Sequence, residues 1–239
     1  MFHCNLYGQD AFMITYKSIK DSDTYMVGED ILYYSPQNNF SVYYEGENIF
    51  FDQRISNDSI RFNSGDYYTT YFNENKLFFR TKVIGSEYKV KEKIPLFNWQ
   101  LTDEKKINEG TLLYKATVSF RERNYTAWYN PEIPIKAGPW KFSGLPGLIY
   151  EIYDNANDFK FSWYLSSLEI STERKFKTDF RNFDLTIEQF VEQLDNAYLN
   201  YKSTIDSRLS ENLTVTETIV TGLENHRQKK REIKYEWEN

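Results

Sequence analysis

Residues 129–154 read YNPEIPIKAGPWKFSGLPGLIYEIYD, and this stretch decides the path of the chain through its fold. It holds four of the six prolines and three of the ten glycines of the protein. Proline fixes φ and removes a backbone donor, whereas glycine occupies positive φ without strain, so together they specify one backbone path. We therefore expect a packed connection that docks onto the core through its large apolar residues, which are Trp140, Phe142, Leu145, Leu148 and Ile149.

The centre of this stretch is the hexapeptide GLPGLI at residues 144–149. Proline followed by glycine is typical of the central positions of a type II turn, so we expect Gly147 to have positive φ after Pro146. Leu145 and Leu148 are expected to be buried. The predicted structural motif comprises Pro131, Pro134, Gly138, Pro139, Gly144, Leu145, Pro146, Gly147, Leu148 and Ile149.

Short β-like runs separated by turn signals flank this stretch, a spacing that is typical of a sheet or barrel. The longest period-two pattern, at residues 112–121, places on one side Leu112, Tyr114, Ala116, Val118 and Phe120. The other predicted strands cover residues 12–16, 40–44, 49–51, 67–72, 76–83, 88–94, 125–129, 148–153 and 159–165. Because no helix interrupts them, we expect a mainly β protein, with a curled antiparallel sheet or a barrel-like meander.

One amphipathic helix is predicted at about residues 186–205. Its apolar positions recur at steps of three and four, at Ile187, Val191, Leu194, Tyr198, Tyr201 and Ile205. Thr186 and Gln189 have the spacing of a capping box, and we expect the helix to pack on the sheet. The secondary structure of residues 213–222 is ambiguous from the sequence. Residues 233–238 alternate apolar and charged, which fits either a final edge strand or a frayed end.

The composition narrows the class of protein. Aromatic residues make up 18% of the 239 residues, with 20 Tyr and 18 Phe, which favours β-structure. The net charge of −6 argues against a nucleic-acid partner. The single cysteine, Cys4, excludes an internal disulfide, and the two histidines, His3 and His226, lie near opposite ends of the chain. We therefore expect no metal site and no cofactor.

The N-terminal residues differ in character from the rest. Residues 1–9 are interpreted as the remnant of a signal peptide, with a small-residue exit at residues 6–9, or as a disordered N-terminus. Residues 10–239 are expected to form a single β-rich domain with its signature region at residues 97–154. The exit at residues 6–9 leads us to expect an exported protein. No stretch approaches the length of an apolar membrane span, so we expect no transmembrane segment.

The GLPGLI hexapeptide and its flanks resemble the signature of the GLPGLI family of diderm bacteria. The flanking matches are residues 97–99, 105–107, 115–117, 127–129, 131–134 and 138–142. Members often have a cysteine near Leu113 and a glycine near Glu122, both absent here. The resemblance implies a secreted envelope protein of unknown biochemical function, located in the periplasm or associated with the outer membrane. It supplies no catalytic residues.

Function is argued from the same stretch. Its glycines, prolines and aromatic residues fix the backbone and its packing and carry no typical catalytic groups. We therefore expect a non-enzymatic binding or accessory subunit for an envelope or outer-membrane protein. An alternative is a carrier that holds a lipid or peptide in the sheet concavity. Four tryptophans, including Trp99 and Trp163, are expected mainly in the core, although they could line a ligand slot. The candidate binding residues are Trp128, Tyr129, Trp140, Lys141, Phe142 and Leu145.

A further alternative is a hydrolase in which Glu132 and Glu151 act as paired carboxylates for general acid–base work. Glu151 alternates with Tyr150 and Ile152, as a residue on a solvated strand face would. Lys141 and Glu132 are also expected to face solvent. We therefore favour a structural role for these ionisable residues and expect no catalytic site.

Overall fold

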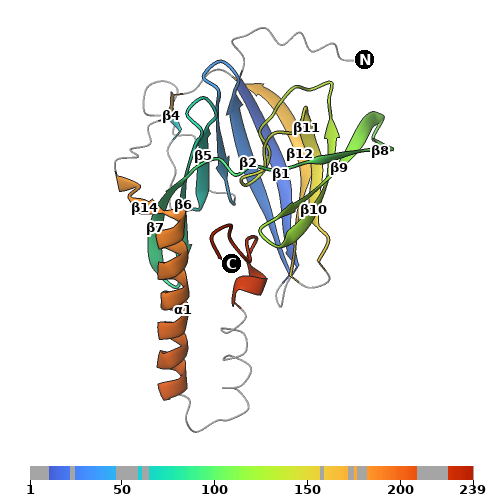
Figure 1. Cartoon of the computed structure of the whole chain (residues 1–239). Helices are drawn as coiled ribbons and strands as arrows, with labels where there is room; N and C mark the ends of the chain where they lie inside the picture. Colours follow the sequence, from blue (N-terminus) through green and yellow to red (C-terminus); the bar gives the residue numbers. More distant parts are fainter. Residues whose placement is uncertain are drawn as a thin grey trace.

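The computed structural model describes residues 11–21, 25–46, 59–60, 65–156, 159–171, 175–176, 182–208 and 226–238 (Figure 1). The expectations for residues 1–9, 49–51 and 213–222 lie outside these ranges. No helix among the described residues has both the length and the apolar character needed to cross a membrane.

One curled, open sheet of twelve strands dominates the described residues, which confirms the expected fold class. Its first half contains β1 (Ala11–Asp21), β2 (Met26–Ser35), β3 (Phe40–Tyr44), β5 (Tyr67–Tyr71), β6 (Lys76–Val83) and β7 (Ser86–Glu92). Its second half contains β8 (Gln100–Asn108), β9 (Thr111–Phe120), β10 (Arg123–Asn130), β11 (Leu148–Asp154) and β12 (Lys160–Ser171). Each half is an antiparallel meander, and the pairing of β1 with β12 joins them.

Three short strands complete the described strand set. β14 (Leu185–Thr186) pairs in parallel with β7 at one edge of the large sheet, and β8 forms the opposite edge. β4 (Ser59–Ile60) and β13 (Lys175–Phe176) form a separate parallel pair.

Tight hairpins connect several of these strands. The two residues between β6 and β7, Ile84 and Gly85, both have positive φ, as do the two between β8 and β9. This is the backbone of a type I′ turn, whose twist matches that of the flanking strands. Arg121 and Glu122 adopt the same conformation between β9 and β10, with φ of 47° and 63°, without a glycine. Arg121 is thereby fixed at a hairpin tip.

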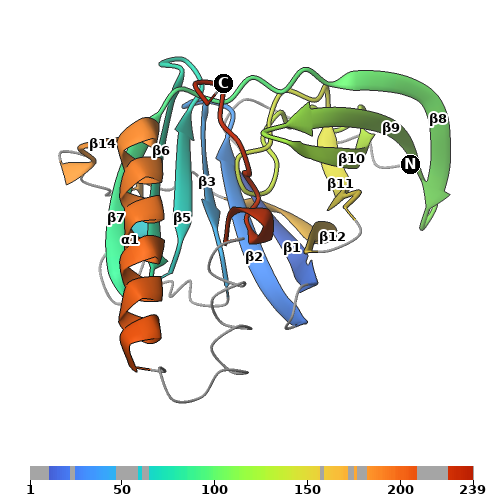
Figure 2. The same cartoon turned by 60° about the horizontal axis from the view of Figure 1, so that its bottom comes forward.

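The main core lies on the inner face of the curled sheet, which is the face that carries the helix and the C-terminal segment (Figure 2). Side chains from both meanders meet there, including Leu32, Phe79, Val90, Val118 and Trp163. The pattern of residues 112–121 is correct from Tyr114 onward but wrong at its start, because Leu113 is buried and Leu112 is 44% exposed. Leu113 shares the outer face with Lys115, and it pairs across the ladder with Lys106, whose long side chain lies against that face.

The Pro/Gly-rich connection between β10 and β11 packs into this core as expected. Phe142, Leu145 and Leu148 are each at most 2% exposed, which confirms their predicted burial. Main-chain hydrogen bonds fix the loop on itself, from Gly138 N to Phe142 O at 2.8 Å and from Leu148 N to Ile133 O at 2.9 Å.

The expected conformation of Gly147 is wrong. Positive φ occurs at Gly144, with φ of 89°, and not at Gly147. Gly147 is required for a different reason, because a Cβ there would lie 2.0 Å from the carbonyl oxygen of Asn130. The second glycine of the hexapeptide therefore permits a close approach of two backbone segments.

The single α-helix among the described residues, α1 (Ile187–Arg208), starts with the predicted capping box. Thr186 N donates to Gln189 Oε1 at 2.9 Å, and Gln189 N donates to Thr186 Oγ1 at 3.3 Å. Its first half covers the inner face, where the Phe190 ring meets those of Phe79 and Tyr88 edge-on at 5.5 and 5.3 Å. The second half projects past the end of the sheet, and Tyr201 is 45% exposed there (Figure 1).

The described C-terminal residues form neither an edge strand nor a frayed end. They begin with a short 3-10 helix, η2 (His226–Lys229). The whole segment 226–238 lies across the inner face of the sheet (Figure 2). Tyr235 of this segment is only 7% exposed and belongs to the main core.

Candidate binding site

A cavity of about 330 Å³ lies between the inner face of the sheet, α1 and the segment 226–238. Its apolar lining comes from all three sides and includes Tyr68, Phe79, Phe161, Phe190, Leu194 and Tyr235, together with Trp140 of the connection between β10 and β11. Charged side chains line it as well, among them Glu45, Lys141, Arg231 and Glu232. The site is therefore amphipathic, with apolar walls next to fixed charges.

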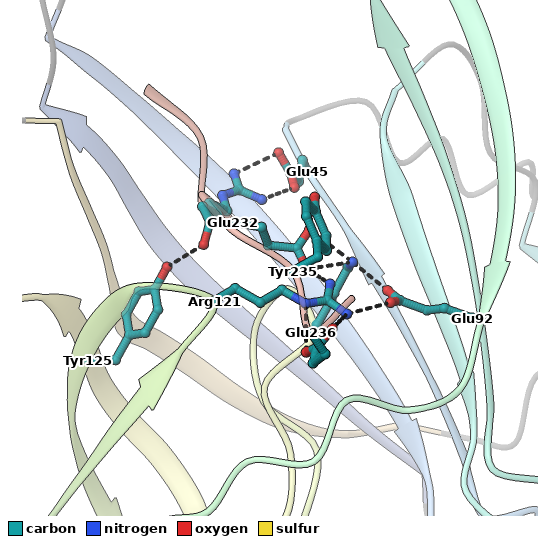
Figure 3. Close-up of polar contacts among 9 residues, drawn as sticks. Glu45, Glu92, Arg121, Tyr125, Glu232, Tyr235 and Glu236 are labelled. Atoms are coloured by element: carbon teal, nitrogen blue, oxygen red, sulfur yellow. Dashed lines mark hydrogen bonds and ion pairs between the residues drawn. The ribbon is translucent and has the colours of Figure 1, made fainter. Parts of the chain in front are cut away.

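A cluster of charged residues lies beside this cavity, and we call it the Arg121 cluster: Glu92, Arg121, Lys141 and Glu232 (Figure 3 labels all but Lys141). The Lys141 Nζ lies 3.1 Å from both carboxylate oxygens of Glu232 and also pairs with Glu92. Arg121 pairs with Glu232 and lies 3.3 Å from Glu92. The side chains of Lys141 and Glu92 are 1% and 2% exposed. These charges therefore depend on one another rather than on water.

The pKa values of the two buried carboxylates of the cluster are shifted in opposite directions. Burial raises the pKa of Glu92, and the attraction of Lys141 and Arg121 offsets only part of that effect. Burial also acts upward on Glu232, but Lys141 and Arg121 outweigh it and lower the pKa of Glu232. Glu232 is therefore the carboxylate that the two cations hold in its charged form.

Side chains of β10 hold the main chain of the segment 226–238. Arg123, which is paired with the buried Asp154, donates from Nε to Lys230 O at 2.5 Å and from Nη2 to Gln228 O at 2.6 Å. The hydroxyl of Tyr125 donates to Arg231 O at 3.1 Å. The sheet thus satisfies the carbonyl groups of a segment that joins no ladder.

A second contact of this segment is made by Arg231. Its guanidinium pairs with Glu45 through both terminal nitrogens and lies over the ring of Trp163 at 5.2 Å. Trp163 in turn donates to the hydroxyl of Tyr43 at 2.9 Å. The pairing with Glu45 keeps the guanidinium charged beside the ring of Trp163.

The structure separates the six candidate binding residues into three places. Trp140 and Lys141 line the cavity. Tyr129, Phe142 and Leu145 are buried in the core without lining it. Trp128 is half-buried on the outer face, with Lys106 Nζ at 4.5 Å from its ring centroid.

The expected exposure of Lys141 is wrong. Lys141 is buried because two carboxylates, Glu92 and Glu232, arrive from distant parts of the chain to meet its ammonium group. Glu132 is exposed as expected. Glu151 lies on the outer face and pairs with Lys106 at 2.6 Å. Neither Glu132 nor Glu151 lines the cavity.

Sequence reasoning missed Glu92, Arg121 and Glu232. Glu92 had a readable signal, because the period of two that buries Tyr88 and Val90 places it on the same face. Arg121 and Glu232 had none, since their positions depend on a hairpin tip and on a segment without regular strand structure. Among the described residues, no group of three or more His, Cys, Asp or Glu side chains is arranged to hold a metal ion.

Comparison with known protein families finds a match for part of the chain. Residues 78–151, which include the GLPGLI hexapeptide, match the sequence model of a family described as "Protein of unknown function (Porph_ging)". A search of the curated proteins finds no match. Two solved structures of PNGF-II, in space groups C2 and P21, are each 12% identical over 79% of this chain, with TM-scores of 0.51. This chain covers 33% and 34% of those chains, so the likeness concerns the fold of about a third of PNGF-II.

Two further structures are more distant. The LolA superfamily protein NE2245 from Nitrosomonas europaea is 10% identical, with 71% of this chain and 88% of that chain covered and a TM-score of 0.30. A putative outer membrane lipoprotein-sorting protein domain from Vibrio parahaemolyticus is also 10% identical, with coverages of 72% and 89% and a TM-score of 0.26. Likeness at this level carries no argument about function. The sequence match alone shows that residues 78–151 carry the pattern of a family of unknown function.

Proposed function

We propose that this protein is a non-enzymatic, exported binding protein of the cell envelope that carries an apolar ligand in the cavity on the inner face of its sheet. The cavity itself is the observation that supports the proposal. Its volume of about 330 Å³ falls within the range of small-molecule sites. Aromatic and aliphatic side chains from the sheet, α1 and the connection between β10 and β11 form its walls.

The chemistry of these walls favours an apolar chain over a polar metabolite. Each methylene group that moves from water into such a site contributes about 0.8 kcal/mol. Phe79 and Phe190 meet edge-on and present one wall, and Trp140 and Phe161 belong to the lining as well. Export and an envelope location are proposed on the resemblance to the GLPGLI family, which implies them.

A cavity-filling variant tests the carrier proposal. Leu194→Trp on α1 should weaken the binding of methyl dodecanoate by more than about tenfold in titration calorimetry, because the larger ring occupies the cavity. Val83→Trp fills it from the sheet side and should act in the same direction. The matched control is Leu199→Trp, on the same helix but 63% exposed, which should bind as the parent does. Binding that is absent from the parent, or unchanged in both filling variants, would overturn the proposal.

A second candidate function is strand addition by a partner protein of the envelope, as expected for an accessory subunit. The edge strand β8 favours it, because Leu101 and Ile107 on it are 58% and 75% exposed. An edge strand with apolar side chains is a template for an added strand. Affinity capture from the envelope with the parent and with Ile107→Lys tests it. A partner lost with Ile107→Lys but kept with Leu194→Trp would support this function, and a partner indifferent to β8 would not.

A further inference from the structure

We propose that the cavity takes a ligand with an anionic head, and that the carboxylate of Glu232 fills the place of that head in the ligand-free protein. The inference rests on the proposed carrier function and names the chemical class of its ligand. It assigns Arg121 and Lys141 as the subsite for the head and the walls around Phe79 as the subsite for the chain.

The first observation is where the two partners lie. Lys141 and Glu232 both line the cavity, so a ligand inside it reaches the contact between them. Lys141 Nζ is 3.1 Å from each oxygen of that carboxylate, and Arg121 pairs with it as well. An ammonium and a guanidinium that converge on one carboxylate form an arrangement that would hold the carboxylate of a ligand equally well.

The second observation is the balance of charge. If Glu232 moves away, Arg121 and Lys141 face only one buried carboxylate, that of Glu92. Glu236, which lies 3.1 Å from Arg121, is on the same segment and would leave with Glu232. The vacated subsite would then hold two cations against one carboxylate in a site withdrawn from water, where an uncompensated charge is costly. An anionic head removes that cost.

The third observation is the closeness of the cationic and apolar subsites. The Lys141 Nζ lies 4.5 Å from the centroid of the Phe79 ring. Phe79 meets Phe190 of α1 on the cavity wall. A chain that runs along these rings would bring a head attached to its end directly to Lys141. The site thus fits an amphiphile better than a free anion.

The fourth observation is how the segment 226–238 is attached. It forms no ladder with the sheet. Its one main-chain hydrogen bond to the β9–β10 hairpin runs from Ile233 N to Arg121 O at 3.0 Å. The other attachments are side-chain contacts, such as those of Arg123 and Tyr125 to its carbonyl groups. Glu232 can therefore withdraw without the loss of any strand pairing.

The experiment compares dodecanoate with methyl dodecanoate by titration calorimetry. Glu232→Gln removes the competing charge with little change of shape, so it should bind dodecanoate about tenfold more tightly than the parent and the ester equally. Lys141→Gln should bind dodecanoate no better than the ester. The control Glu151→Gln removes a carboxylate that pairs with Lys106 on the outer face, away from the cavity, and it should bind both probes as the parent does.

A measurement on the unaltered protein covers the case in which these variants fold poorly. Hydrogen exchange at the Ile233 amide, which donates to Arg121 O, should speed up with dodecanoate but not with the ester. If both probes bind and neither Glu232→Gln nor exchange at Ile233 distinguishes them, the anionic-head inference is overturned while the carrier function stands. If neither probe binds the parent or Glu232→Gln, both proposals fail.

Discussion

The ammonium group of Lys141 lies 3.1 Å from both carboxylate oxygens of Glu232, although 91 residues separate the two in the chain. Lys141 belongs to the Pro/Gly-rich connection, and Glu232 to the C-terminal segment. The contact therefore ties the signature stretch to the end of the described chain. It also places a charged pair at the wall of the cavity.

Removing this ammonium group should be costly. Lys141→Met leaves the two buried carboxylates Glu92 and Glu232 with Arg121 as their one shared cation, so we expect a loss of about 3–5 kcal/mol in the free energy of unfolding. The control is Lys106→Met, whose partner Glu151 is on the outer face, and a partly exposed pair of this kind contributes about 1 kcal/mol or less. Urea denaturation measures both. Equal losses in the two variants would mean that burial does not make the contacts of Lys141 more important for stability than those of Lys106.

The glycines of the hexapeptide should differ in their tolerance of a side chain. Gly147→Ala brings a Cβ against the Asn130 carbonyl group, a clash with backbone that should cost about 2–4 kcal/mol. Gly144→Ala meets open space and carries only the cost of positive φ, about 1–2 kcal/mol. Thermal and chemical denaturation would establish the order. A larger loss at Gly144 would contradict the close approach of the two backbone segments.

Stability should depend on pH in opposite directions through the two buried carboxylates. The raised pKa of Glu92 means that the folded state binds its proton more tightly, so its contribution falls as the pH rises above the ordinary value of 4.5. The lowered pKa of Glu232 gives stability that is present above 4.5 and lost as the pH falls below it. As the pH rises above 4.5, the parent should therefore lose stability relative to Glu92→Gln, which carries no titrating group at this position. An unchanged difference, measured by urea denaturation, would refute this assignment.

Features that depend on neighbouring residues could be predicted from the sequence, whereas features that depend on contacts between distant segments could not. The strand at residues 76–83 was predicted with its bounds as found, because a period of two and a hairpin tip are local signals. The capping box of Thr186 is equally local. Whether the sheet closes depends on which edges meet, so the sequence left an open sheet and a barrel as alternatives.

The candidate site depended on contacts that no local pattern encodes. Lys141 was expected to face solvent, because its local sequence contains no information on Glu232 or on the path of the segment 226–238. The burial of Leu145 and Leu148 was predictable, since apolar residues in a rigid loop need a core to contact. The burial of Lys141, which precedes both leucines in the same stretch, was not predictable.

The capping box gives a test of α1. Thr186→Ala removes the hydroxyl group that accepts from Gln189 N, so it should cost about 1 kcal/mol. Thr204→Ala, on the exposed second half of the helix, should change stability by less than about 0.5 kcal/mol. Chemical denaturation compares the two. A smaller loss at Thr186 than at Thr204 would show that the helix does not depend on its cap.

Truncation distinguishes a structural C-terminal segment from a frayed one. A chain that ends before His226 lacks Glu232, Arg231 and Tyr235, which contact the inner face. Arg121 and Lys141 then keep only Glu92, so we expect a loss of at least about 3 kcal/mol in the free energy of unfolding.

A chain that ends after Glu236 is the matched control for this truncation. It keeps the Arg121 cluster and loses Trp237, which is 38% exposed, and Glu238, which accepts from Tyr235 N at 2.8 Å. Its loss should be about 1–2 kcal/mol, from that hydrogen bond and from the partly exposed pair of Glu238 with Arg227. A terminal segment that merely lies on the surface could be removed at little cost in both truncated chains. Equal and small losses by urea denaturation would therefore show that the inner face does not need the segment, and would remove the basis for Glu232 as an occupant of the cavity.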